Sequence, residues 1–376
     1  MKLVLIGPVY PFRGGIAHFN AGLAAAMSQT HQVEVLSFKR QYPSWLYPGQ
    51  SDREPAGSQA PDLSPTYLLD SLNPLTWMAA KRWLREVNPD GVIFQWWITF
   101  WAPAYAYLAD QLHKQNVPVI FLIHNVMPHE PRLTDRSLAR LALKKADAYI
   151  TLNPRETKRL ADLLGSRHLQ VTESSLPLYE PSEQERWSRS EAREKLNLPK
   201  NEKVLLSFGL VRPYKGIGLA FEALGQLKKR GNCPNYLVAG ECWDDLSIYQ
   251  KRLHELDLTD KVRFDNRYIP NEELGLYFSA ADGYIAAYTG GTQSGALRMA
   301  AGFGLPIIAS QYIVEGFKLP QEYPLQVFPT GNIDSLVDAL ENWSRNPVTQ
   351  IDMTDSDIWG GVTRAVEEAV QGVHQK

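Results

Sequence analysis

The sequence predicts an α/β protein with two doubly wound, Rossmann-like domains, each built on a parallel sheet. The chain has 376 residues, which is too long for one ordinary hydrophobic core and favours two domains. Short apolar segments alternate with helical segments in each half, which is typical of parallel strands buried on both faces. We expect the two domains to face each other across a cleft that holds a ligand with two chemically different halves.

The composition excludes several classes of protein. Hydrophobic residues make up 44% and charged residues 21% of the chain, as in a folded globular protein. The net charge of −2 gives no general attraction to nucleic acids. The two cysteines, Cys233 and Cys242, have no histidine at metal-ligand spacing, so we expect two buried thiols in a reducing compartment and no metal site.

The uncharged residues 91–109 approach the length of a membrane-spanning helix. Within them, Gly91–Gln95 has the pattern of a buried strand, and Pro103 is placed to begin a helix over Ala104–Lys114. The apolar run at the start of the sequence is too short for a secretion signal. We therefore expect a cytoplasmic protein without a membrane span.

The first block of alternating segments contains short apolar runs that predict strands. They cover Lys2–Ile6, Gln32–Phe38, Gly91–Gln95, Val117–Ile123 and Ala148–Leu152, and a helix is expected over Ala17–Met27. Residues 40–66 interrupt the alternation with Pro, Gly, Ser and aromatic residues, which indicates a long functional loop. The polar residues 180–201 fit a helix and a linker between the domains.

The second block repeats the alternation. Its expected strands are Val204–Phe208, Asn235–Ala239, Val262–Phe264, Gly283–Ala287 and Pro306–Ala309. The intervening helices are expected to begin near Gly216, Ser247, Asn271 and Gly291, and apolar spacing predicts a last helix over Asp357–Val373.

The first strand-to-helix loop reads G-P-V-Y-P-F-R-G-G-I over residues 7–16. Gly14 and Gly15 therefore present backbone amides at the start of a helix, an arrangement that binds phosphate or another anion. A plain tight turn explains the glycine pair equally well. The loop lacks the G-x-G-x-x-G spacing of dinucleotide-binding proteins, which argues against a nicotinamide enzyme.

Three further loops carry candidate functional groups at carboxyl ends of expected strands, where ligands bind in such folds. Arg212 and Lys215 form a candidate clamp for a departing diphosphate, although two solvated loop cations are the alternative. The sequence T-G-G-T-Q-S-G at 289–295 has more glycine and polar residues than a helix cap needs and predicts a cradle for an anion or a sugar. His124 ends a strand, and this position favours a functional histidine over a structural one.

These motifs together resemble the family 4 glycosyltransferases, which have the two-domain glycosyltransferase B (GT-B) fold. The resemblance extends over nearly the whole chain and is strongest to a bacterial branch. The motifs are F-R-G-G-I-A-H, W-L-Y-P-G-x-S-D, H-N-V-x-P-H-E, R-P-Y-K-G and T-Q-S-G, at residues 12–18, 45–52, 124–130, 212–216 and 292–295. The resemblance implies an acceptor-side domain at 1–185, a donor-binding domain at 186–354, and a helix within 355–376 that packs back on the first domain.

The resemblance implies an enzyme that transfers a sugar from a nucleoside-diphosphate sugar with retention of configuration, usually without a metal ion or a cofactor. As catalytic residues it implies His124 against the donor sugar and Arg212 with Lys215 on the donor diphosphate. The remaining implied donor contacts are Gly14 and Gly15 on the phosphates, Tyr268 and Ile269 beside the base, and a cradle of Gly290, Gly291, Thr292, Gln293, Ser294 and Gly295.

One departure from the family concerns a glutamate pair that commonly contacts the sugar and the ribose. Thr289 and Leu297 occupy those two positions here. We expect Gln293 and Ser294 to take over contact with the sugar or the diphosphate. Glu241, after the strand Asn235–Ala239, is the candidate for ribose, although an acidic residue at a helix start is an equally good interpretation.

The acceptor side has two candidate features. The first feature is a set of aromatic residues: Trp45, Tyr47, Trp96, Trp97 and Trp101. Their side chains are candidates either for stacking on sugar rings or for packing in the core. The second feature is a set of four cations spaced by four residues: Arg132, Arg136, Arg140 and Lys144. This spacing predicts a basic stripe on one helix face, with Leu133, Leu138 and Leu141 on other faces. The stripe is either a solvated face or a surface that docks on anionic lipid headgroups at the inner face of a membrane.

The sequence therefore favours a retaining glycosyltransferase that acts on a glycan or lipid-linked acceptor, in polysaccharide or cell-envelope glycan biosynthesis. A nucleotide-sugar epimerase of the same fold is one alternative. A non-catalytic scaffold that has lost the glutamate pair is the other, and the presence of both Arg212 and Lys215 argues against it.

Overall fold

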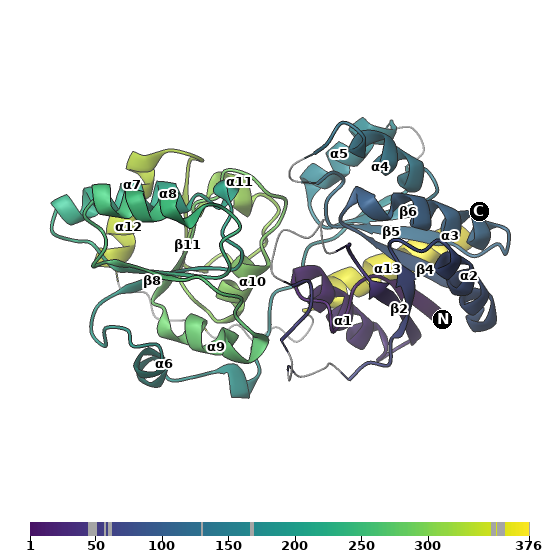
Figure 1. Cartoon of the computed structure of the whole chain (residues 1–376), viewed down its shortest axis with the longest axis horizontal. Coiled ribbons are helices and arrows are strands. Elements are labelled where there is room, and N and C mark those ends of the chain that lie inside the picture. Colours follow the sequence, from purple (N-terminus) through teal and green to yellow (C-terminus); the bar gives the residue numbers. More distant parts are fainter. Residues whose placement is uncertain are drawn as a thin grey trace. The chain divides into compact units, whose positions relative to one another are not determined.

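The computed structural model of the chain describes residues 1–43, 51–55, 58, 62–128, 131–165, 169–346, 351 and 358–375. The chain forms two compact units (Figure 1). Unit 1 comprises Met1–Pro177 and Trp359–Lys376, and unit 2 comprises Leu178–Ile358. Each unit is a parallel sheet with helices on both faces, so the predicted fold class is confirmed.

Unit 1 contains a sheet with the order β3-β2-β1-β4-β5-β6-β7, in which every pairing is parallel. Its strands are β1 Lys2–Ile6, β2 Gln32–Arg40, β3 Thr66–Asp70, β4 Gly91–Trp96, β5 Val119–Ile123, β6 Ala148–Thr151 and β7 Val171–Glu173. The chain starts at β1, builds outward to β3 and then returns to the other side of β1. The topological switch therefore lies between β1 and β4, where ligands bind in doubly wound sheets.

Helices cover the two faces of this sheet because successive strand residues point to opposite sides. Leu3 and Leu5 pack with α1 and α13, whereas Val4 and Ile6 pack on the side of α2 to α5. The helices are α1 Gly15–Met27, α2 Leu75–Val87, α3 Ala102–His113, α4 Asp135–Leu143, α5 Pro154–Leu164 and α13 Gly360–His374.

The C-terminal helix α13 belongs to unit 1 although most of unit 2 precedes it in the chain (Figure 1, yellow). It packs against β6, β7 and α1, and a Cβ on Gly22 of α1 would lie 2.3 Å from the ring of Trp359. The helix begins at Gly360, three residues after the expected start, and residues 352–357 lie outside the described part of the chain.

Unit 2 contains a parallel sheet with the order β10-β9-β8-β11-β12-β13. Its strands are β8 Val204–Phe208, β9 Asn235–Ala239, β10 Val262–Asp265, β11 Gly283–Ala286, β12 Ile307–Ser310 and β13 Leu325–Phe328. One face is covered by α6 Arg189–Lys195, α9 Asn271–Ala280, α10 Gly295–Gly302 and α11 Gln311–Val314. The other is covered by α7 Ile217–Lys229, α8 Leu246–Glu255 and α12 Ile333–Arg345.

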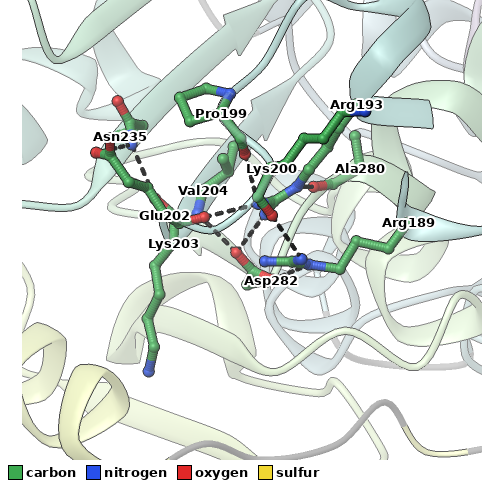
Figure 2. Close-up of polar contacts among 10 residues, drawn as sticks. All are labelled: Arg189, Arg193, Pro199, Lys200, Glu202, Lys203, Val204, Asn235, Ala280 and Asp282. Atoms are coloured by element: carbon green, nitrogen blue, oxygen red, sulfur yellow. Dashed lines mark hydrogen bonds and ion pairs between the residues drawn. The ribbon is translucent and has the colours of Figure 1, made fainter. Parts of the chain in front are cut away.

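A buried arginine fastens α6 to the sheet of unit 2 (Figure 2). Arg193 is fully buried, and its Nε donates to the carbonyl of Ala280 while its Nη2 donates to the carboxylate of Asp282. Its Nη1 donates to three backbone carbonyls, those of Pro199, Lys200 and Glu202. Each nitrogen of the guanidinium therefore has a protein partner, which is what allows this charge to be buried.

Several expectations about individual elements were wrong. The helix expected near Gly291 begins at Gly295, because the preceding residues form a loop. A 3-10 turn, Thr99–Trp101, leads into α3, which therefore begins two residues early, at Ala102. Cys233 and Cys242 are half-buried rather than buried, and both are free thiols.

Candidate functional site

The two predicted cations of unit 2 lie on the loop that follows β8. Arg212 precedes a 3-10 turn, Pro213–Lys215, which places both side chains just beyond the carboxyl end of the strand. The Lys215 ammonium donates to the carbonyl of Phe208 at 3.2 Å and lies 5.7 Å from the centroid of the Tyr288 ring. The ammonium is therefore held near the end of β8 rather than extended into solvent.

The loop after β8 is joined to the loop after β11 through Tyr214. The amide of Thr289 donates to the carbonyl of Tyr214 at 2.7 Å. Cβ atoms on Gly290 and Gly291 would lie 3.2 and 3.3 Å from the Tyr214 side chain, so the two glycines allow this side chain to pack against the second loop. The motifs R-P-Y-K-G and T-G-G-T-Q-S-G, about 75 residues apart, thus form one site at the carboxyl edge of the sheet.

The second loop leads into the N-terminus of α10. The Ser294 hydroxyl accepts from the amide of Leu297 at 3.1 Å and lies 3.1 Å from the Tyr288 hydroxyl. In the described residues, the side-chain Nε2 of Gln293 is buried and has no hydrogen-bond partner. A buried amide donor without a partner is costly, so this group is a candidate for contact with a ligand.

Glu241 follows β9 and lies beside the cation loop. Its carbonyl accepts from the amide of Val211 at 2.9 Å, and Trp243 follows with its ring 5.6 Å from the Arg212 guanidinium carbon. This approach of the strand ends needs glycine, because a Cβ on Gly240 would lie 2.3 Å from the Gly209 carbonyl oxygen. The Arg212 guanidinium and the Trp243 ring are therefore adjacent, next to the backbone of Glu241.

The residues expected beside the base, Tyr268 and Ile269, and the residues Thr289 and Leu297 differ in exposure. Tyr268 is half-buried after β10, whereas the Ile269 side chain is part of the hydrophobic core, so only its backbone can contact a ligand. Thr289 is exposed, and Leu297 is 1% exposed within the same core. The side chain of Leu297 therefore packs in the core and has no surface to offer a ligand.

In unit 1, Gly14 and Gly15 form the N-terminus of α1 and are exposed. Gly14 has a φ of 109°, which favours glycine, and a Cβ on either residue would meet no described atom within 4 Å. In the described part of the chain, α1 has neither a capping side chain nor an acidic residue in its first turn. The positive end of the helix is therefore available to an anion.

His124 lies at the carboxyl end of β5, at the edge of the sheet where ligands bind in doubly wound folds. Its Nε2 is 2.8 Å from the side-chain oxygen of Gln95 on β4, and its ring packs edge-on against Phe19 at a centroid distance of 4.9 Å. Burial lowers the pKa of His124 from 6.5 to about 3, so the ring is neutral at physiological pH. Because an amide oxygen only accepts, Nε2 carries the proton and Nδ1 is an acceptor suited to a hydroxyl donor.

The structure decides between the two interpretations of the acceptor-side tryptophans that it describes. Trp96, Trp97 and Trp101 are buried at 0%, 8% and 1% exposure, so they pack in the core and do not present rings to a sugar. Trp45 and Tyr47 lie outside the described residues. The four stripe cations, Arg132, Arg136, Arg140 and Lys144, are all exposed, but only Arg136 and Arg140 lie within α4.

The surface around α4 also contains apolar groups. Leu133, in the turn before the helix, is fully exposed, and Leu141 is 46% exposed, whereas Leu138 is half-buried against the core. Exposed leucines therefore lie near exposed cations on this part of the chain. In the part of the chain that the structure describes, no helix is long and apolar enough to cross a bilayer.

Sequence reasoning missed Tyr214, Gln95 and Trp243. Tyr214 is inside a recognised motif, but its packing against Gly290 depends on a distant segment. Gln95 has a visible signal, since it is a polar residue inside the otherwise apolar strand β4 and is fully buried. A Cβ on Gly7 would lie 2.6 Å from the Gln95 side chain, so the glycine at the end of β1 makes room for it.

Comparison with known families identifies a domain in each half of the chain. Residues 13–172 match the family described as Glycosyltransferase Family 4, and residues 188–356 match the family described as Glycosyl transferases group 1. The first range contains Gly14, Gly15 and His124, and the second contains Arg212 and the loop that leads into α10. The two matches together cover most of both units.

One curated relative and several solved structures are similar to the chain. Alpha-monoglucosyldiacylglycerol synthase from Streptococcus pneumoniae (strain ATCC BAA-255 / R6) is 28% identical over 203 residues, 52% of this chain and 44% of that protein. The match thus spans less than half the length of that relative.

Among solved structures, sucrose-phosphate synthase from Thermosynechococcus elongatus has a TM-score of 0.65 at 19% identity, covering 99% of this chain and 94% of that chain. The catalytic domain of starch synthase IV from Arabidopsis thaliana, bound to ADP and acarbose, has a TM-score of 0.74 at 15% identity, with coverages of 100% and 99%. Anabaena HepE in complex with UDP and glucose has a TM-score of 0.66 at 15% identity, with coverages of 100% and 97%. These similarities show a shared fold. The chain therefore joins a Glycosyltransferase Family 4 domain to a Glycosyl transferases group 1 domain and is a glycosyltransferase of the GT-B fold.

Proposed function

We propose that the chain transfers a sugar from a nucleoside-diphosphate sugar to a glycan or lipid-linked acceptor, with retention of the anomeric configuration. The observation that carries this proposal is the single site in unit 2 where Arg212, Lys215 and the N-terminus of α10 meet. Two cations and a positive helix end stabilise the negative charge that develops on a leaving diphosphate. The family membership supports the same chemistry.

In the proposed reaction, the bond between the anomeric carbon and the diphosphate oxygen breaks while the acceptor hydroxyl attacks from the same face. The leaving phosphate, held by Arg212 and Lys215, accepts the proton of that hydroxyl, so no separate carboxylate base is required. The neutral ring of His124 contributes through its Nδ1 acceptor to binding of the sugar. The reaction needs no metal ion or cofactor.

We assign the donor contacts within unit 2 as follows. Gln293, whose buried Nε2 has no partner among the described residues, donates to the sugar or to a phosphate oxygen. Ser294 contributes at the helix start, and Glu241, adjacent to Val211, holds the ribose hydroxyls. The base lies beside Tyr268 and the backbone of Ile269. In unit 1, Gly14 and Gly15 offer amides to the phosphates.

We place the acceptor at the cytoplasmic face of a membrane, in polysaccharide or cell-envelope glycan synthesis. The name of the streptococcal relative describes a glucosylated diacylglycerol, which supports a lipid acceptor. The exposed cations Arg136 and Arg140, next to the exposed Leu133, support docking on anionic headgroups.

A panel of nucleoside diphosphates and nucleoside-diphosphate sugars tests the proposal. Thermal shift identifies the base and the sugar, and proton NMR of the released or transferred sugar reports its anomeric configuration. We expect one diphosphate sugar to stabilise the protein at millimolar concentration or below, and its sugar to be transferred or hydrolysed with retention in the presence of EDTA. Conversion of the sugar to its epimer would favour an epimerase. A protein that no member of the panel stabilises, with Gln293→Ala identical to wild type, would indicate a non-catalytic scaffold.

A further inference from the structure

Among the residues that the structure describes, unit 2 contains two buried arginines whose surroundings differ. Arg193 is fully buried, and all three of its side-chain nitrogens donate to protein oxygens (Figure 2). Arg298, in α10, is 7% exposed, and among the described residues its guanidinium has no hydrogen-bond or ion-pair partner. The ring of Phe317 lies against it, with the guanidinium carbon 4.5 Å from the ring centroid.

The side chain of Arg298 contacts the segment that follows α11 through Phe317. The same segment is fastened just beyond α10, where the Tyr323 hydroxyl donates to the carbonyl of Leu305 at 2.6 Å. The nitrogen atoms of Arg298 are not among the fully buried atoms that lack a partner, so its guanidinium keeps a small contact with solvent. A ligand therefore has an approach to it.

Burial of Arg298 is unfavourable for the protein without a ligand. Desolvation lowers the pKa of Arg298 to about 9, because no opposite charge compensates the loss of water. A contact with an aromatic ring recovers only part of the free energy that a buried charge loses when water is removed from it. Buried charges are normally paired, and an exception in a native structure points to a functional site.

The position of Arg298 identifies that site. Its amide donates to the carbonyl of Ser294 at 3.2 Å, which places it one helical turn beyond the loop of Gly290 to Ser294. This loop is the proposed cradle for the donor, at the edge where β11 and β12 end.

We propose that Arg298 is a binding residue for an anionic group of the substrate, a carboxylate or a phosphate, and that this group is the missing partner of its guanidinium. The inference rests on the proposed function for the identity of the ligand as a sugar substrate. The planar guanidinium matches both carboxylate and phosphate oxygens in a bidentate arrangement. Phe317 fixes the plane of the guanidinium and thereby the direction from which the anion binds.

The first experiment compares the thermal midpoints of Arg298→Met and Arg193→Met in the full-length protein without substrate. Methionine keeps much of the length and removes the charge. We expect Arg193→Met to lower the midpoint, because it removes a fully paired guanidinium, and Arg298→Met to leave it unchanged or raise it by about 2 °C or more. A lowered midpoint in Arg298→Met would mean that the arginine is structural and would overturn the proposal.

The second experiment measures stabilisation by inorganic phosphate and by acetate, each against sodium chloride at equal ionic strength. It uses the variant Arg212→Ala/Lys215→Ala, with and without Arg298→Met, so that anion binding by the diphosphate clamp does not contribute. We expect at least one anion to raise the midpoint and the effect to fall at least twofold when Arg298 is replaced. Phosphate as the stabilising ion identifies a phosphorylated substrate, and acetate identifies a sugar carboxylate.

If neither anion stabilises the protein beyond chloride, or if the effect survives in Arg298→Met, the proposal is wrong. These probes contain no nucleotide, so the result does not depend on whether the chain is a transferase. A chain that fails to bind any nucleotide sugar but shows the Arg298-dependent effect would disprove the proposed function and leave this inference standing.

Discussion

A Cβ placed on Gly216 would lie 1.9 Å from the carbonyl oxygen of Ala287, so the loop that carries Arg212 and Lys215 touches the end of β11 without space for a side chain. Gly216 also has a φ of 68°, in the left-handed region that favours glycine. We predict that Gly216→Ala lowers the free energy of unfolding by about 1–3 kcal/mol and weakens nucleotide binding, because the loop must shift.

The matched control for this prediction is Gly218→Ala, two residues further along in α7. A Cβ on Gly218 would meet no described atom within 4 Å, so alanine should be neutral or stabilising by up to about 1 kcal/mol. Chemical unfolding measures the free energy of unfolding of both variants. Equal values for Gly216→Ala and Gly218→Ala would contradict the role given to Gly216.

Removal of the buried guanidinium of Arg193 should be among the most destabilising substitutions in unit 2. The substitution leaves the Asp282 carboxylate and several backbone carbonyls without their donor. We predict a loss of about 3–5 kcal/mol for Arg193→Met. Arg189 donates to the same carboxylate but is exposed, so Arg189→Met should cost less than about 1 kcal/mol. Similar losses of unfolding free energy in Arg193→Met and Arg189→Met would show that burial of Arg193 is not the cause of its effect on stability.

His124 gives a prediction about pH. Its pKa is lowered from 6.5 to about 3 in the folded protein, so between these values the unfolded chain binds a proton and the folded chain does not. Stability is therefore present above pH 6.5 and is lost as the pH falls, with a limiting slope of about 1.4 kcal/mol per pH unit.

The substitution His124→Gln should remove this contribution. Urea unfolding at pH 7 and pH 5 should show a smaller acid loss in the variant than in wild type, whereas the exposed His254→Gln should behave as wild type. If wild type and His124→Gln lose the same stability between the two pH values, His124 is not a buried neutral ring.

The exposed stripe of Arg132, Arg136, Arg140 and Lys144 should determine membrane binding. Each cation near an anionic surface contributes on the order of 1 kcal/mol. Replacing all four by Gln should abolish sedimentation with phosphatidylglycerol-containing vesicles. A control with the same loss of charge replaces four exposed lysines of unit 2: Lys195, Lys200, Lys229 and Lys251. Wild-type protein that does not sediment at physiological salt would refute the docking surface.

The strands that the sequence predicted well are those with continuous apolar runs between breakers. β8 and β9 have the expected bounds, because each run is apolar and ends before glycine. β3, β7 and β13 were not predicted. β3 begins at Thr66, where the expected long loop ends. β7 and β13 are short, and Thr172 and Gln326 interrupt their apolar pattern, so the neighbouring strand supplies most of what makes these two segments extended.

The loops of the candidate site were predictable because their residue types are unusual at strand ends. The contact between the two loops was not predictable. Tyr214 contacts Thr289 and Gly290, but neither sequence segment contains a pattern that indicates the other as its partner. Arg298 was missed for a related reason. An arginine in a helix predicts a solvated side chain, and its burial here, with the distant Phe317 against it, depends on tertiary packing.

The most direct test of the account is the turnover of Lys215→Ala and Arg212→Ala with the nucleotide sugar that the panel selects. Loss of one preorganised charge-stabilising group is predicted to lower kcat by about 100-fold or more and to weaken nucleoside-diphosphate binding. Lys229→Ala, an exposed lysine at the end of α7, should match wild type in both measurements. If Lys215→Ala or Arg212→Ala retains wild-type turnover and affinity, the loop after β8 does not hold the donor diphosphate, and the central claim fails.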